Sequence, residues 1–258
     1  PFLFLAICEG LFLSLWYYSP RPIVSIVLAP IIRAFMGEQF LHYPLNFLVL
    51  PKLISISRVI IYFGLGLVTL SMTISAVFQL EVDKSVSWFF GNFNRALRQY
   101  PIFLLWSIIY GLGVLVCYKA PLFFVAKFQV QTNPFPAYLP LLCSFVMLVF
   151  VETIFIYLPV TMLIQGKTLL AKVKEALRFS FRFFVSTVFF VFIIRCLKLL
   201  MFLLRIYCFK IIEKFFPQLP EFTLIVLSLE IFVFFLANCF LTITAAEFYL
   251  LQSQEAKE

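Results

Sequence analysis

Residues 222–249 read FTLIVLSLEIFVFFLANCFLTITAAEFY, and this stretch decides the fold class. Two carboxylates, Glu230 and Glu247, are its only charged side chains. A helix needs roughly 20 predominantly apolar residues to cross the hydrocarbon core of a bilayer. Because the stretch exceeds that length, it predicts a transmembrane helix.

The composition of the whole chain agrees with this prediction. Of its 258 residues, 64% are hydrophobic and 12% are charged, whereas soluble domains average roughly 45–50% and about 25%. So few polar side chains cannot cover the surface of a soluble fold. We therefore predict an all-α integral membrane protein with about six transmembrane helices. They cover residues 1–17, 53–80, 101–128, 137–163, 183–206 and 222–249.

Short sequence matches indicate an internal repeat. Arg95-Ala96-Leu97-Arg98 precedes the third span, and Glu175-Ala176-Leu177-Arg178 precedes the fifth. The second and sixth spans hold the similar small-residue runs 73–76 and 242–245, which favour close helix packing in lipid. We therefore predict a single transmembrane domain of three helical hairpins, followed by a polar tail. The domain is residues 1–252, its units are about 1–81, 85–165 and 168–252, and the tail is 253–258.

Three segments outside the spans predict helices at the membrane surface. Residues 85–99 and 169–182 carry apolar and polar side chains on opposite helical faces, which is typical of interfacial amphipathic helices. Thr168 is the predicted N-cap of the second one. Residues 23–50 are interrupted by prolines and charges, so they predict short interfacial or re-entrant helices. The run PFLFL at 1–5 resembles PIFLL at 101–105; if this match belongs to the repeat, we expect a third amphipathic helix before Pro1.

The net charge of +8 points to lipid headgroups rather than to nucleic acid, because the chain is so apolar. The densest basic cluster, residues 167–182, favours a cytoplasmic position for that loop. The helix at 169–182 either rests on headgroups or docks a soluble partner. Its candidate interfacial or partner-docking residues are Lys172, Lys174, Arg178 and Arg182. The expected partners are membrane lipids and other membrane-protein subunits.

Charged residues inside apolar spans are costly, and they mark candidate functional sites. The candidate intramembrane polar site comprises Glu9, Arg58, Glu152, Arg195, Lys198 and Glu230. Arg195 and Lys198 share one helix face, where Glu230 could meet them. Glu152 is expected to pair with Arg58 or to line a water-filled cleft. Two interpretations follow: ion pairs that fix helix register, or a polar cavity for an anionic headgroup or a translocated solute.

Motifs of common catalytic sites are absent from the sequence. It has no phosphate-binding loop, no H-E-x-x-H, no G-x-S-x-G and no metal-ligand spacing of its Cys residues and single His42. We therefore expect no catalytic, cofactor or metal site, and no enzyme. The leading hypothesis is a scaffold or accessory subunit of a membrane complex, or an envelope-maintenance protein. The alternative is a transporter or lipid-handling protein with a polar intramembrane cavity.

One further pattern carries a family resemblance. Pro159-Val160 lies near the end of a span, Gly166-Lys167 breaks the chain, and the run EALRFSFR at 175–182 leads into the next span. This pattern resembles the YciC-type group of bacterial membrane proteins. It is also similar to the membrane domains that accompany some glycerophosphodiester phosphodiesterases. The resemblance implies a six-helix domain in the bacterial inner membrane, without catalytic residues to carry over.

Overall fold

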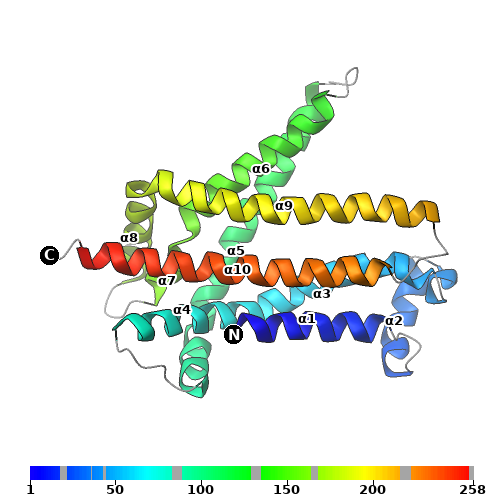
Figure 1. The fold of residues 1–258 in the computed structure, drawn as a ribbon, viewed down its shortest axis with the longest axis horizontal. Coiled ribbons are helices and arrows are strands. Elements are labelled where there is room, and N and C mark those ends of the chain that lie inside the picture. Colours follow the sequence, from blue (N-terminus) through cyan, green and yellow to red (C-terminus); the bar gives the residue numbers. More distant parts are fainter. Residues whose placement is uncertain are drawn as a thin grey trace. The chain divides into compact units, whose positions relative to one another are not determined.

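The structure, a computed structural model, describes residues 1–17, 22–35, 37–42, 45–82, 89–128, 135–163, 168–215 and 222–255. Over these ranges the chain is helical and contains no strand (Figure 1), so the all-α prediction is confirmed. In the part of the chain that the structure describes, five helices are long and apolar enough to cross a membrane. They are Leu53–Leu80, Gly91–Cys117, Leu142–Met162, Phe184–Cys208 and Phe222–Ser253.

The first predicted span forms a shorter helix. Helix α1, Phe2–Tyr17, has 16 residues, which gives it a length of about 24 Å against a hydrocarbon core of about 30 Å. Its apolar part is Phe2–Ser14. The lengths of the described helices are therefore compatible with five membrane crossings, and they do not confirm the predicted sixth.

Contacts within the chain define two compact units. Unit 1 comprises Pro1–Gly66 and Leu197–Cys239, and unit 2 comprises Leu67–Cys196 and Phe240–Glu258. The backbone passes from one unit to the other inside helices α9 (Phe184–Phe215) and α10 (Phe222–Glu255). The predicted division into three units of sequence stays a prediction.

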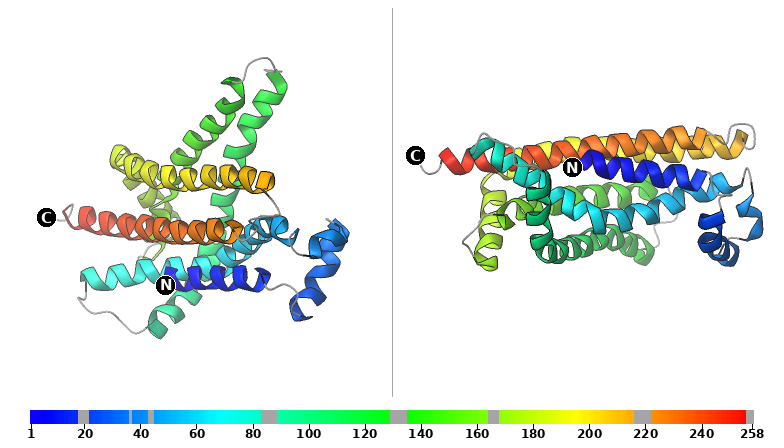
Figure 2. Two further views of the ribbon diagram at one scale, coloured as in Figure 1. Left: turned by 45° about the vertical axis from the view of Figure 1, so that its right-hand side comes forward. Right: turned by 90° about the horizontal axis from the view of Figure 1, so that it is seen from below.

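Unit 1 is built on the packing of α1 against α3, which lie side by side in Figures 1 and 2. Its other elements are α2 (Pro22–Phe35), the short 3₁₀ helix η1 (Glu38–Leu41), α3 (Asn46–Ile61) and the π-helical segment η2 (Tyr62–Gly66). The apolar core of the unit joins α1, α3 and α10. Its buried members are Leu13, Leu50, Ile54, Leu227 and Ile231.

Unit 2 contains the remaining helices. They are α4 (Leu67–Val82), α5 (Phe89–Phe128), α6 (Phe135–Phe155), α7 (Leu158–Met162) and α8 (Leu169–Arg182). Helices α5 and α6 run side by side (Figure 1), and α8 lies steeply across the direction of α9 (Figures 1 and 2). Thr168 occupies the N-cap position of α8 as predicted, although its side chain makes no capping hydrogen bond.

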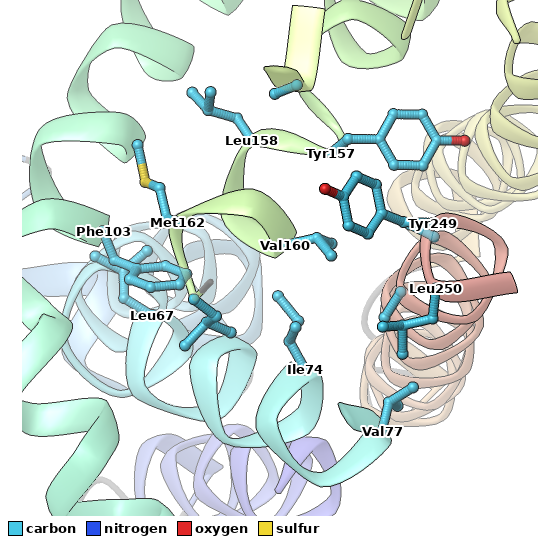
Figure 3. Packing of buried hydrophobic residues seen from close by; sticks show 14 residues of the cluster. Leu67, Ile74, Val77, Phe103, Tyr157, Leu158, Val160, Met162, Tyr249 and Leu250 are labelled. Atoms are coloured by element: carbon cyan, nitrogen blue, oxygen red, sulfur yellow. The ribbon is translucent and has the colours of Figure 1, made fainter. Parts of the chain in front are cut away.

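The core of unit 2 forms where α4, α5, α7 and α10 meet, as Figure 3 shows. Tyr157 and Tyr249 lie close together there, with ring centroids 6.4 Å apart. Val160 lies between α4 and the two tyrosines in this view. Phe103 and Met162 pack in the same cluster and bring α5 and α7 into it.

The helices of two predicted spans have bounds that differ from those of the spans. The helix of the third span does not begin at Pro101, because α5 continues through that residue from Phe89. Ala96 and Phe103, on either side of it, are both buried against the helices around them, so packing holds the helix together across the proline. The fourth span breaks between α6 and α7 instead, where Pro159 cannot donate the hydrogen bond that would continue the helix.

The outward surface of the longest apolar helices is itself apolar. On α9, Val185 is 81% exposed, Phe189 is 67% exposed and Leu200 is 63% exposed. Their spacing places them along one side of the helix. Extended apolar surfaces of this kind are rare on soluble monomers.

Candidate functional site

Among the described residues, the buried ion pairs form two polar clusters, one in each unit. In unit 1, the Glu230 cluster consists of Glu9, Arg58, Tyr62, Lys198, Arg205, Glu230 and Asn238. In unit 2, the Glu152 cluster consists of Tyr110, Glu152 and Arg195. These clusters form the candidate site.

Helical spacing explains how the Glu230 cluster is assembled. On α10, Glu230, Phe234 and Asn238 follow one another at intervals of four, so they line one face of the helix. Arg58 at the end of α3 and Tyr62 at the start of η2 repeat the same interval. The charged and the hydrogen-bonding residue are therefore about one turn apart for Arg58 and Tyr62, and about two turns apart for Glu230 and Asn238.

Arg58 and Glu230 are at the centre of the ion pairs in this cluster. Nε of Arg58 donates to Oε2 of Glu9 at 3.0 Å, and its Nη1 donates to Oε1 of Glu230 at 2.8 Å. Nη1 of Arg205 reaches both oxygens of Glu230, at 3.1 and 3.2 Å. One carboxylate thus binds arginines from two helices, α3 and α9, and one guanidinium binds carboxylates from α1 and α10.

The second layer of the cluster consists of the neutral side chains of Tyr62 and Asn238, the ammonium group of Lys198 and the ring of Phe234. Nδ2 of Asn238 donates to the hydroxyl oxygen of Tyr62 at 2.9 Å, and Nζ of Lys198 donates to Oδ1 of Asn238 at 2.7 Å. The ring of Phe234 lies below two cations, with its centroid 4.9 Å from Cζ of Arg58 and 5.8 Å from Nζ of Lys198.

Burial makes this arrangement necessary. The side chain of Glu230 is 4% exposed and that of Arg58 is 15% exposed, and an unpaired charge is strongly unfavourable in such surroundings. Mutual pairing removes most of that penalty. One donor is left over: among the described residues, Nη2 of Arg58 is buried and has no hydrogen-bond partner.

The Glu152 cluster joins α5, α6 and α9. Nε of Arg195 donates to Oε2 of Glu152, and its Nη2 donates to the hydroxyl oxygen of Tyr110 at 2.8 Å. Tyr110 is held in place by stacking on Trp106, with the ring centroids 5.4 Å apart. The cluster therefore fixes the side chain of Arg195 from two neighbouring helices at once.

The structure corrects the partners that the sequence predicted. Glu230 pairs with Arg58 and Arg205 instead of with Arg195 and Lys198, and Glu152 pairs with Arg195 instead of with Arg58. Arg195 and Lys198 are three residues apart, which turns them about 60° from each other around the helix. That angle is enough for them to bond different neighbouring helices.

Sequence reasoning missed four members of the clusters. Arg205 falls at the edge of the predicted fifth span, yet it follows Lys198 by seven residues and shares its face of α9. Asn238 carries the same signal on α10, since it follows Glu230 by eight residues. Tyr62 and Tyr110 give no comparable signal, because tyrosine is common in apolar helices of membrane proteins.

The predicted docking residues of α8 fall into two groups. Lys174 and Arg178 are exposed, as is Arg182 one turn further on. Lys172 is instead half-buried, and its Nζ donates to the carbonyl oxygen of Met162 at 2.9 Å. Glu175 also faces the protein and accepts a hydrogen bond of 2.8 Å from the hydroxyl of Tyr249. The exposed basic stripe of α8 is therefore Lys174, Arg178 and Arg182.

Within the described ranges, no group of three or more His, Cys, Asp or Glu side chains is placed to hold a metal ion. A comparison of the chain with protein-family models, curated proteins and solved structures found no match.

Proposed function

We propose that this chain is an integral membrane protein of the bacterial inner membrane that crosses the bilayer six times. Five long apolar helices and the apolar residues exposed along α9 support this proposal. Helix α1 supplies the sixth crossing, since local thinning and flanking residues accommodate a short hydrophobic stretch at modest cost. The three hairpins of the repeat then each contribute two crossings.

Helix α8 lies at the cytoplasmic surface in this proposal. Its exposed stripe, Lys174, Arg178 and Arg182, is one-sided and basic, as expected for a helix that meets anionic headgroups or an acidic partner. The opposite side is anchored in unit 2, where Ala176 and Ser180 are buried. Anchoring on one side leaves the basic side available for an interaction.

The chain acts in this account as a non-enzymatic scaffold or accessory subunit of a membrane complex. The observation that carries the proposal is the pairing of the intramembrane acids. Glu9, Glu152 and Glu230 each bind an arginine from another helix. Charges that neutralise one another in this way fix the register of packed helices.

Purification in mild detergent tests this function. We expect a stoichiometric protein partner to co-purify with the wild type and to be lost when Lys174→Gln and Arg178→Gln remove two of the three charges of the exposed stripe. The control variant Arg33→Gln with Lys119→Gln removes the same charge from exposed positions elsewhere, and it should keep the partner. A partner-free monomer that transports solute in liposomes would overturn the proposal.

A second candidate function is a transporter or lipid-handling protein. The observation that favours it is Nη2 of Arg58, a buried donor without a partner in the described part of the chain. A passing anion could accept that hydrogen bond. Solute flux in liposomes that disappears in Glu230→Gln would favour this candidate over the scaffold.

A further inference from the structure

A groove lies along the start of α5, outside both polar clusters. It is lined by Gly91, Asn94, Arg95, Leu97, Arg98 and Gln99 and has a volume of about 730 Å³. Sites for small molecules have volumes of roughly 300–1,000 Å³. The groove is therefore large enough for the polar headgroup of a lipid.

The start of α5, which lines the groove, packs against α4 within unit 2. Asn92 on α5 and Gln79 on α4 exchange two amide hydrogen bonds, of 3.0 and 3.3 Å. Ala96, one turn further on, is buried against Val68 and Met72 of α4. Since these contacts hold one side of α5, the adjacent side keeps a fixed set of polar groups in the groove.

The chemistry of the groove favours an anion that also carries a hydroxyl. The guanidinium groups of Arg95 and Arg98 have no ion-pair partner in the parts of the chain that the structure describes. Arginine binds phosphate oxygens through two parallel donors. Oε1 of Gln99 is buried and accepts no hydrogen bond among the described groups, so it calls for a donor such as a hydroxyl.

The position of the groove on α5 identifies the source of such a group. Immediately beyond it, α5 exposes large apolar side chains at Leu105, Ile109 and Leu112. In a membrane-spanning α5, this change from basic to apolar surface marks the headgroup level. A ligand with a phosphate in the groove and acyl chains along the exposed apolar side matches both surfaces.

We propose that the groove at Arg95, Arg98 and Gln99 binds the headgroup of an anionic, hydroxyl-bearing phospholipid such as phosphatidylglycerol. The two arginines hold the phosphate, and a headgroup hydroxyl donates to Gln99. This inference rests on the proposed insertion of the chain in a membrane, and it assigns a lipid class to a site that the sequence did not reveal.

Native mass spectrometry of the delipidated protein, titrated with phosphatidylglycerol or phosphatidylcholine, tests the site. We expect phosphatidylglycerol to bind more tightly, and the variant Arg95→Gln with Arg98→Gln to lose about thirtyfold in affinity, because each basic residue near a lipid surface contributes about fivefold. The control variant Arg33→Gln with Lys119→Gln has the same net charge as the Arg95/Arg98 variant. It should bind phosphatidylglycerol as tightly as the wild type does.

A second variant tests the hydroxyl. Gln99→Met removes the acceptor and leaves both arginines in place. We expect it to bind phosphatidylglycerol and phosphatidylmethanol equally, whereas the wild type prefers phosphatidylglycerol. A wild type that does not distinguish these two lipids would refute the role of Gln99.

Other outcomes separate this inference from the proposed function. Equal affinity of the Arg95/Arg98 variant and its control overturns the site while leaving membrane insertion intact. Displacement of the lipid by millimolar inorganic phosphate identifies free phosphate as the ligand and overturns the lipid assignment. A protein that cannot be incorporated into lipid nanodiscs overturns the membrane proposal, and the site with it.

Discussion

At the scale of single residues, Glu230 is a buried carboxylate that joins two arginines. It accepts hydrogen bonds from Arg58 and Arg205, and those two arginines belong to different helices. Arg58 in turn binds Glu9 of α1. Four helices are thus linked through one guanidinium and one carboxylate, and the loss of either group leaves a buried charge without its partner.

We therefore expect Glu230→Gln to lower the free energy of unfolding by about 3 kcal/mol, as is typical when one partner of a buried ion pair is removed. The matched control is Glu38→Gln, which breaks the exposed pair with Arg33 and should change stability by at most about 1 kcal/mol. Unfolding of the purified protein in mixed micelles measures both values. Similar losses in the two variants would show that the Glu230 pairing adds little stability.

At the scale of helices, the π-helical segment η2 positions Tyr62 for its hydrogen bonds. π-helical turns inside α-helices often occur at functional sites. This one contains Gly64 and Gly66. A Cβ atom added to Gly66 would lie 3.3 Å from Cδ1 of Tyr62, whereas one added to Gly64 would meet nothing within 4 Å. Of these two glycines, only Gly66 is in tight contact with the side chain of Tyr62.

These two glycines give a paired prediction. Gly64→Ala should raise the free energy of unfolding by up to about 1 kcal/mol, because alanine favours helix over glycine. Gly66→Ala should lose that gain, because the methyl group pushes the ring of Tyr62 away from Asn238. Thermal unfolding in detergent compares them. A Gly66→Ala protein as stable as Gly64→Ala would contradict the proposed packing.

The sequence predicts helices well here, and their partners poorly. Apolar runs of sufficient length predict α9 and α10 directly, since every buried backbone group must be hydrogen-bonded within its own helix. The continuity of α5 through Pro101 is decided by how Ala96 and Phe103 pack, which no local pattern contains. The partner of Glu152 is likewise set by the packing of α6 against its neighbours.

At the scale of the whole molecule, the account requires its apolar surface to face acyl chains. Leu200 on α9 and Leu170 on α8 give a matched pair of positions, because both are leucines and both are largely exposed, at 63% and 81%. In a protein without a membrane, two such side chains would be equally accessible to water. In the proposed arrangement, only Leu170 lies near the aqueous surface.

Cysteine labelling in native membranes is the most direct measurement. The six natural cysteines are first replaced by serine or alanine, and Leu200→Cys or Leu170→Cys is then introduced alone. We predict that a membrane-impermeant maleimide, applied to opened vesicles, labels the cysteine at 170 and leaves the one at 200 unlabelled until detergent denatures the protein. Rapid labelling of both positions before denaturation would contradict the claim that α9 crosses the bilayer.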